Sequence, residues 1–184
     1  GARAVAERYA TLFGRGDGSF APMTPIASQA QGGAWVVACA DLNLDGHPDL
    51  LAAGSGGQRT YSDNGDGSFQ APKVHSPVIA PRLATGDLNA DDQPDVVFST
   101  GFGIRVALGN PGGTLTLLPG RNLPGTPSSI AVGRLDGDHS ASIAVGLGSS
   151  GSTAVIHGVG DGTFGLAKSL ATGGLPNGTW SVIP

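Results

Sequence analysis

One nine-residue segment, rich in side-chain oxygens, occurs three times in this chain and constrains its fold more than any other feature. The first copy, residues 41–49, has Asp or Asn at positions 1, 3, 5 and 9 and Gly46 at position 6. The second, 87–95, begins 46 residues later with Asp92 at position 6, and a degenerate third, 134–142, begins 47 residues after that. A fixed period of about 20 to 50 residues is typical of repeat architectures, in which each unit stacks on its neighbours.

A Gly-rich marker recurs with nearly the same period. Gly-Asp-Gly followed by Ser or Thr and then Phe stands at 16–20, 65–69 and 160–164, and a variant, Gly-Gly-Thr-Leu, stands at 112–115. Asp-Gly between two apolar runs favours a hairpin turn, because Gly adopts the positive φ that tight turns require. We expect the Phe, or Leu115, to point inward and anchor the strand that follows.

Short apolar runs between these markers have the length of β-strands, and four fall in each repeat. Four antiparallel strands at a period of about 40 to 50 residues are typical of one blade of a β-propeller. The predicted fold class is therefore all-β, with four-stranded antiparallel blades and no helix longer than one turn. The twelve predicted strands are 34–40, 50–53, 59–62, 69–75, 82–85, 96–99, 104–108, 115–118, 129–132, 143–147, 153–157 and 164–170.

The two ends of the chain continue the repeat pattern. Residues 1–20 align without gaps with 50–69, and 179–183 align with 34–38. This predicts one domain of about four repeats, closed into a ring by pairing of the terminal strands. Half of an eight-bladed ring completed by a homodimer, and a piece of a longer array, stay open. The predicted units are a partial blade 1–30, blades 31–77, 78–124 and 125–175, and a closing strand 176–184.

Charge and hydropathy exclude two classes of partner. The net charge is −4 and the 10 Lys and Arg residues form no basic cluster, so nucleic acid is not an expected partner. No apolar run reaches the length of about 18 residues that suggests a membrane span, so we expect no membrane insertion. Cys39 is the only cysteine, which excludes an internal disulfide, and its apolar neighbours predict a buried thiol.

The distribution of carboxylates argues against catalysis. Of the 13 Asp residues, nine lie in the three oxygen-rich segments and four in Gly-rich turns, and Glu7 is the only Glu. No carboxylate pair remains for general acid–base chemistry, so the chain is not expected to be an enzyme.

The oxygen-rich segments have the composition of loops that bind a hard cation. Ca²⁺ takes about six to eight oxygen ligands at about 2.3–2.6 Å, and alternate residues of a tight loop can direct that many inward. Carboxylates held close together repel one another, so a bound cation would keep such a loop folded. Two divalent cations would balance the net charge of −4.

The pattern Asp-x-Asn-x-Asp-Gly-x-x-Asp, then an apolar strand and Gly-Asp-Gly-Ser/Thr-Phe, resembles the FG-GAP/VCBS repeats of integrin-α-like propellers over nearly the whole chain. In that family the acidic loop joins the first two strands of a blade and holds Ca²⁺. The resemblance implies two calcium sites, each with four side chains and one backbone carbonyl. They comprise Asp41, Asn43, Asp45 and Asp49 with the carbonyl of His47, and Asp87, Asn89, Asp91 and Asp95 with the carbonyl of Gln93.

The third loop departs from the family pattern. Arg134 replaces the first carboxylate and Ser142 the last, which leaves only Asp136 and Asp138. The Arg134 guanidinium can pair with these two carboxylates in place of a metal. We therefore expect no Ca²⁺ in the loop from Arg134 to Ser142.

Members of this family serve as adhesion heads, lectins and appended domains of secreted enzymes or toxins. The resemblance therefore implies a calcium-stabilised recognition module, extracellular or at the cell surface, that binds carbohydrate or another protein. The alternative is a structural spacer or assembly domain of a larger secreted or surface protein, without its own ligand. Trp35 and Trp180 share one repeat position, where they either stack on a sugar ring or pack between blades.

Overall fold

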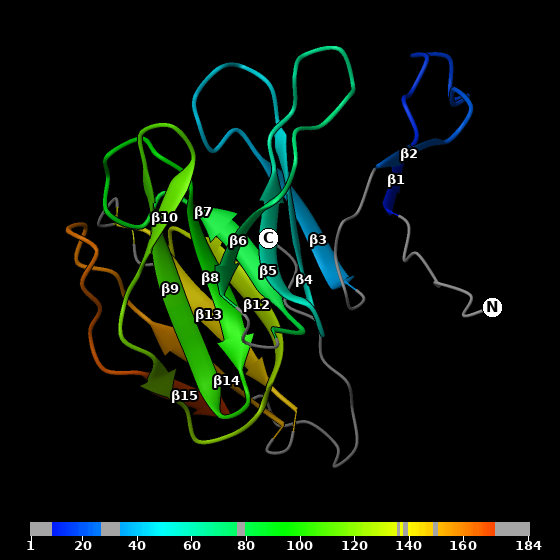
Figure 1. The fold of residues 1–184 in the computed structure, drawn as a ribbon. Helices are drawn as coiled ribbons and strands as arrows, with labels where there is room; N and C mark the ends of the chain where they lie inside the picture. Colours follow the sequence, from blue (N-terminus) through cyan, green and yellow to red (C-terminus); the bar gives the residue numbers. More distant parts are fainter. Residues whose placement is uncertain are drawn as a thin grey trace.

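Every regular element in the described part of the chain is a β-strand, and the strands form four antiparallel sheets (Figure 1). The computed structural model describes residues 9–26, 34–76, 80–135, 137, 140–148 and 151–171. Within those ranges, no helix has the length and apolar character needed to cross a membrane. The all-β prediction is confirmed for the residues described.

Three of the sheets follow one another along the chain and are named sheets I, II and III below. Sheet I contains β3 (Ala34–Ala40), β4 (Asp49–Gly54), β5 (Gly57–Tyr61) and β6 (Lys73–Ser76). Sheet II contains β7 (Leu83–Gly86), β8 (Asp95–Thr100), β9 (Gly103–Asn110), β10 (Thr114–Leu117) and β11 (Arg121–Asn122). Sheet III contains β12 (Pro127–Gly133), β13 (Ser142–Leu147), β14 (Ser152–Ile156) and β15 (Lys168–Ala171). The fourth sheet is an N-terminal hairpin of β1 (Tyr9–Thr11) and β2 (Thr24–Ile26).

All twelve predicted strands are present in sheets I to III, but two of them begin four residues later than predicted. In sheets I and III the fourth strand begins at Lys73 and Lys168, because the Gly-Asp-Gly segment forms a wide turn. Phe69 and Phe164 make only isolated bridges, to Asp63 and Gly158, before the regular pairing starts. Within each turn the Asp accepts a hydrogen bond from the backbone N–H two residues later, as the Asp-Gly turn chemistry predicts.

The residue after each Gly-rich turn anchors its sheet in three repeats out of four. Phe69, Leu115 and Phe164 pack against three separate apolar clusters. Phe20, in the N-terminal hairpin, is instead 60% exposed. The predicted inward anchor is therefore confirmed in sheets I to III and wrong for the hairpin.

Strand β11 is an element that the sequence pattern missed. It has two residues and pairs with β9, where Arg121 lies opposite Ile104. Gly103 makes this pairing possible, since a Cβ atom there would lie 2.0 Å from the Arg121 carbonyl oxygen. A two-residue strand leaves no periodic signal, and only the Gly before an apolar run marks the close approach.

The three sheets stack face to face through their first strands. Strand β7 contacts β3 on one side and β12 on the other, so sheet II lies between sheets I and III. Neighbouring residues of a strand point to opposite faces, and all six residues of β4 are buried because both of its faces are covered. Leu50 packs toward the N-terminal hairpin, whereas Leu51 packs toward sheet II.

The stacking agrees with successive propeller blades, but ring closure falls outside the described residues. The predicted closing strand 176–184 and residues 1–8, which the repeat pattern aligns with 50–57, are both outside them. The four-bladed ring and its eight-bladed alternative therefore stay predictions.

The prediction of a buried Cys39 thiol is wrong, because Cys39 is exposed. Along β3, Val37 and Cys39 are exposed, while Val36, Ala38 and Ala40 are half-buried. One face of β3 packs toward sheet II, and the alternate residues Val37 and Cys39 point away from it. An unbroken apolar run does not reveal which of its faces has a neighbour.

Candidate metal site

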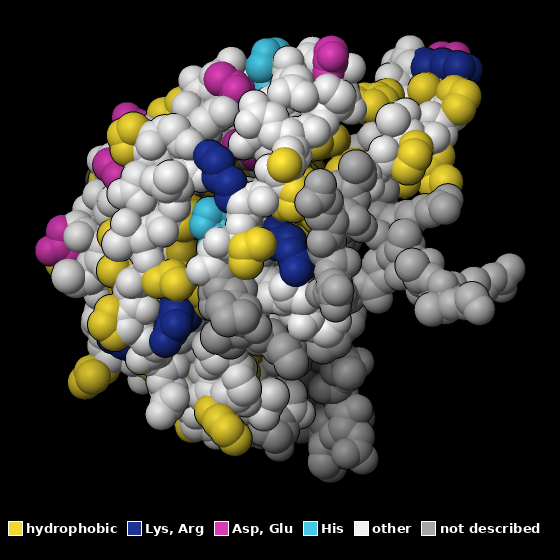
Figure 2. Space-filling view, in the orientation of Figure 1, with side chains coloured by type: hydrophobic (Ala, Val, Ile, Leu, Met, Phe, Trp, Pro, Cys, Tyr) yellow, Lys and Arg dark blue, Asp and Glu magenta, His cyan; other side chains and the backbone are white. Residues whose placement is uncertain are grey.

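The two intact acidic loops occupy equivalent places in sheets I and II. Residues 41–48 connect β3 to β4, and residues 87–94 connect β7 to β8. Both loops project from the edge of the sheets that also carries the Gly-rich turns, uppermost in Figure 1. Acidic side chains are spaced along the upper and left edges of the molecule in the same view (Figure 2).

The two loops share an unusual backbone conformation. At position 4, Leu44 and Ala90 have φ values of 57° and 61°, and at position 6, Gly46 and Asp92 have values of 86° and 63°. Positive φ is uncommon for residues other than Gly, Asn and Asp. Its recurrence at a Leu and an Ala indicates that the loop imposes the conformation. Asp92 adopts this conformation at the position where the first loop has Gly46, and Asp tolerates positive φ better than most residues do.

In the first loop, backbone amides turn the side-chain oxygens inward. The two carboxylate oxygens of Asp41 accept hydrogen bonds from the N–H groups of Asp45 (3.0 Å) and Gly46 (2.8 Å). Asn43 Oδ1 accepts a second bond from the Asp45 N–H, at 3.1 Å, and Asn43 Nδ2 donates to Asp45 Oδ2 at 2.7 Å. Asp45 Oδ1 accepts from the His47 N–H at 2.9 Å. The oxygens at positions 1, 3 and 5 therefore belong to one hydrogen-bonded network.

The second loop repeats this network residue by residue. Asp87 accepts from the N–H groups of Asp91 (3.3 Å) and Asp92 (3.2 Å). Asn89 accepts from the Asp91 N–H at 3.3 Å and donates to Asp91 Oδ2 at 2.9 Å. Asp91 Oδ1 accepts from the Gln93 N–H at 2.8 Å. The two loops differ in sequence and yet hold equivalent side-chain oxygens in the same hydrogen-bonded arrangement.

The Asp at position 9 has a structural task that the sequence did not reveal. Asp49 is 1% exposed and accepts hydrogen bonds from the Leu42 N–H (3.1 Å) and the Asp63 N–H (3.0 Å). It therefore connects the start of the acidic loop to the residue at the start of the Gly-rich turn. A carboxylate has about four lone-pair positions, so these two bonds leave acceptor capacity for a cation.

Asp95 has the same role in sheet II. It is fully buried and accepts from the N–H groups of Leu88 and Gly109, both at 2.7 Å. The acidic pattern alone treats position 9 as a metal ligand like positions 1, 3 and 5. Its place at the first residue of a buried strand was the signal for a backbone acceptor, because a buried carboxylate needs hydrogen-bonding partners.

The environments of these carboxyl groups shift their pKa values in opposite directions. Burial raises the pKa of Asp49 and of Asp95, and the hydrogen bonds from backbone N–H groups partly oppose this. The nearby carboxylates of the same loop raise both values further. In contrast, the hydrogen bonds from the His47 N–H and from Asn43 lower the pKa of Asp45. Each loop therefore concentrates negative charge beside a buried carboxyl group.

Each acidic loop also touches a Gly-rich turn of the next sheet. A Cβ atom on Gly113 would lie 3.3 Å from the Cβ of Asn43, and one on Gly162 would lie 3.5 Å from the Cβ of Asn89. Within sheet I, the His47 ring covers Gly65, where an added Cβ would lie 2.7 Å from Nε2. The loops thus lie at the seams between adjacent sheets, and their conformation affects both neighbours.

The third loop is only partly described. Arg134 is exposed and Gly137 has a φ of 75°, whereas Asp136, Asp138 and His139 lie outside the described residues. Ser142, at position 9, is fully buried, and its hydroxyl lies 3.4 Å from His157 Nδ1. The expected absence of Ca²⁺ from this loop stays a prediction.

Carboxylates alone do not assemble a metal site here. In the described ranges, no three His, Cys, Asp or Glu side chains gather in a group that could hold a metal ion. The sites implied for the two intact loops also use an Asn oxygen and a backbone carbonyl. These are oxygen donors of the kind that Ca²⁺ prefers, so the chemistry of the donor set fits the ion.

The fold and its loops define an all-β repeat module, and comparison with known proteins identifies the family. The FG-GAP-like repeat model matches residues 6–52 and 41–98, which together span half of the chain. The chain belongs to the FG-GAP-like repeat family. A search of curated protein sequences finds no match.

The solved structures that are similar to this chain include a lectin and a toxin pore. One is a lectin of Agrocybe aegerita that specifically recognises non-reducing terminal N-acetylglucosamine; the identity is 25% and the TM-score 0.65. That match covers 90% of this chain and 46% of the lectin chain, so this chain spans about half of the lectin's length. The other is the Tc holotoxin pore of Photorhabdus luminescens, with 16% identity, a TM-score of 0.39, and coverage of 94% of this chain and 11% of the toxin chain.

Proposed function

We propose that this chain is a calcium-stabilised recognition module of an extracellular or cell-surface protein, and that its ligand is carbohydrate. The observation that supports this most strongly is the similarity to the Agrocybe aegerita lectin over 90% of the chain. Because that lectin recognises non-reducing terminal N-acetylglucosamine, glycans with this terminus are the first ligands to test.

In this proposal the loops at 41–49 and 87–95 each hold one calcium ion. Asp41, Asn43, Asp45 and the His47 carbonyl would hold it in the first loop together with the remaining lone pairs of Asp49. The equivalent residues of the second loop are Asp87, Asn89, Asp91, Gln93 and Asp95. When bound, the ion supplies positive charge beside carboxylates that repel one another. Repulsion from the nearby carboxylates contributes to the raised pKa values of Asp49 and Asp95, although burial is the larger cause.

The proposed role of the ion is to fix the seam between sheets. Asn43 and Asn89 lie in the acidic loops and adjoin the Gly-rich turns of the next sheet. Holding the loop therefore also holds the turn beside it. A rigid framework of this kind can present its connecting loops as a binding face. The proposal includes no catalytic step.

A glycan array probed with this chain, with and without a calcium chelator, tests the proposed function. We expect binding to glycans that end in N-acetylglucosamine and a loss of binding when the chelator is added. The matched control is the double variant Asp41→Arg/Asp87→Arg, which copies Arg134 of the third loop and should behave as the chelated protein does. If the folded, calcium-loaded protein binds no glycan at high concentration, the carbohydrate function is wrong and the spacer function is favoured.

A further inference from the structure

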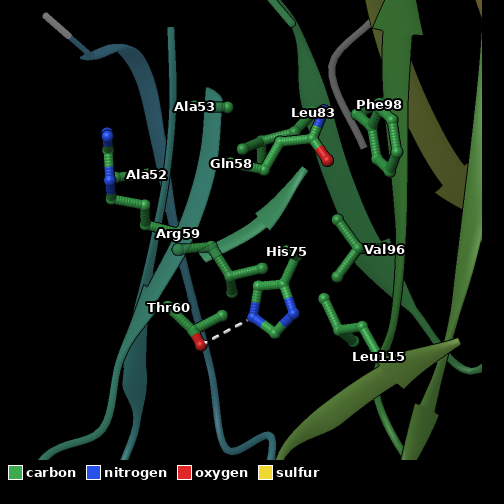
Figure 3. A pocket seen from close by; sticks show the side chains of 11 residues that line it. Ala52, Ala53, Gln58, Arg59, Thr60, His75, Leu83, Val96, Phe98 and Leu115 are labelled. Carbon is green, nitrogen blue, oxygen red and sulfur yellow. Dashed lines mark hydrogen bonds between the residues drawn. The ribbon is translucent and has the colours of Figure 1, made fainter. Parts of the chain in front are cut away.

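Two cavities lie between adjacent sheets at equivalent positions of the repeat. The first, between sheets I and II, has a volume of about 20 Å³ (Figure 3), and the second, between sheets II and III, has a volume of about 170 Å³. Five lining residues of the second stand 46 to 49 positions after lining residues of the first. These pairs are Gln58 and Ile104, Thr60 and Val106, His75 and Arg121, Val96 and Ile143, and Leu115 and Phe164.

Four of the eleven residues that line the first cavity are polar, and all four come from sheet I. In Figure 3 the His75 ring lies between Thr60 and Leu115, and its Nε2 is 2.9 Å from Thr60 Oγ1. The Gln58 side chain extends toward Leu83 and Phe98 at the other end. The remaining 20 Å³ is enough for about one water molecule.

The second cavity is larger and is lined mainly by residues with apolar side chains. Seven of its eight lining residues are apolar, and Arg121 is the exception. Val145 stands at the repeat position of Phe98, so a smaller side chain occupies the matching place in sheet III. An apolar cavity of about 150 Å³ is enough to take up a benzene molecule. The cavity between sheets II and III therefore has room for a ring or a branched alkyl group.

Arg121 places one positive charge in the wall of this cavity. Its guanidinium donates to the carbonyl oxygens of Phe164, at 3.1 Å from Nη2, and of Gly165. No carboxylate of the described residues forms an ion pair with it. A guanidinium has five N–H donors, so two bonds to carbonyls leave donors for an anion. The pairing of β11 with β9 holds Arg121 at this place.

We propose that the cavity between sheets II and III binds a small carboxylic acid with an aromatic or branched-alkyl body. The body occupies the apolar volume and the carboxylate pairs with Arg121. A sugar fits this cavity less well, because several of its hydroxyl groups would face the apolar side chains of seven lining residues and lose hydrogen bonds to water. This site is therefore separate from the carbohydrate site of the proposed function, and either can fail without the other.

A titration of the whole chain with benzoate, followed by NMR of the isoleucine methyl groups, tests the proposal. We expect saturable shifts at Ile104, Ile143 and Ile156. Arg121→Gln should weaken benzoate binding by about tenfold or more, as expected for a lost hydrogen bond to a charged group, and leave the binding of neutral benzyl alcohol nearly unchanged. Val106→Phe should fill the cavity and abolish the binding of both compounds.

The control for the filling variant is Val74→Phe, the same substitution at a side chain that is 62% exposed, which should bind benzoate as the unmodified chain does. If Val106→Phe does not fold, Val106→Met provides the smaller filling substitution. The proposal is overturned if benzoate causes no saturable shift, or if a filled cavity still binds it. An equal loss of both compounds in Arg121→Gln, or displacement of benzoate by N-acetylglucosamine, contradicts the assigned ligand class.

Discussion

The molecule has two seams, one between sheets I and II and one between sheets II and III. Their rims, which are the edges formed by the acidic loops and the Gly-rich turns, are alike, but their interiors differ. At both rims an Asn of the acidic loop adjoins a Gly of the next sheet's turn. Inside, the first seam contains Gln58, Thr60 and His75, whereas the second has Ile104, Val106 and Arg121 at these positions. The cavity volume differs accordingly, about 20 Å³ against about 170 Å³.

This difference shows which part of a seam the repeat determines. The rim depends on carboxylates that accept hydrogen bonds from backbone N–H groups, among them the buried Asp at position 9, and on Gly residues with positive φ. The interior depends on side-chain volume and polarity, which change freely from one repeat to the next. Substitutions at the rim should therefore have similar effects in both seams, whereas the effects of substitutions in the interior should differ from one seam to the other.

The largest effect is expected from breaking the shared rim at Asp95. Asp95→Ala removes the acceptor for the buried N–H groups of Leu88 and Gly109, and each unpaired buried donor costs about 1–3 kcal/mol. The variant also no longer has to bury a carboxyl group away from water, which offsets part of this loss of stability. We expect the free energy of unfolding to fall by about 3 kcal/mol, as measured by urea denaturation.

Asp95→Ser provides the control for this change, because Ser is the residue at position 9 of the third loop. It keeps one oxygen at the site and should destabilise the protein less than Asp95→Ala. Equal stability of Asp95→Ala and the unmodified chain would show that the bonds from Leu88 and Gly109 are not important for the seam.

A smaller effect is expected from making the interior of the first seam like that of the second. Phe98 is 2% exposed and lines the first cavity, and its counterpart in sheet III is Val145. Phe98→Val should enlarge this cavity and lower the free energy of unfolding by about 2 kcal/mol, below the range for complete truncation of a buried Phe to Ala. The reciprocal variant Val145→Phe serves as the comparison. If Phe98→Val leaves the urea midpoint unchanged, side-chain volume does not determine the stability of this seam.

The smallest effect concerns the response of the first seam to pH. Burial, aided by the charge of Lys73, lowers the pKa of His75 below its ordinary value of about 6.5. The unfolded chain then binds a proton more readily than the folded chain, so stability should fall as pH decreases below about 6.5 and level off once the folded protein is protonated.

His75→Asn should reduce the loss of stability between pH 7.5 and pH 5, measured as the change in urea midpoint between the two conditions. The unmodified chain and a Lys73→Gln variant provide the comparison. An identical pH dependence in His75→Asn would show that another group is responsible.

The sequence predicted the repeated backbone of this protein well and its particular side-chain environments poorly. Strand positions followed from the period, because each acidic loop and Gly-rich turn marks the end of a strand. The exposure of Cys39 did not follow, since an apolar run is the same whether one or both of its faces are covered. Strand β11 is too short to leave a pattern.

The candidate metal loops, too, could be predicted from the sequence only in part. Their position and oxygen donors were evident from Asp41, Asn43 and Asp45, because alternate residues of a tight loop share one side. The bonds of Asp49 to Leu42 and Asp63 join segments that are 7 and 14 residues away, so they depend on how the sheet brings these segments together. The inter-sheet cavities depend on pairs of residues from different repeats and could not be seen in any single one.

The central claim is that two cations stabilise this module through its intact loops, and calorimetry tests it most directly. Titration with Ca²⁺ should give two binding events, and excess Ca²⁺ should raise the melting temperature relative to EDTA. Saturation of two sites at about 100 times Kd would contribute about 5 kcal/mol, equivalent to a shift of about 10 °C or more for a chain of this size. The Asp41→Arg/Asp87→Arg variant should show neither effect. Equal melting temperatures of the unmodified chain in EDTA and in excess Ca²⁺, with no heat of binding, would contradict the claim.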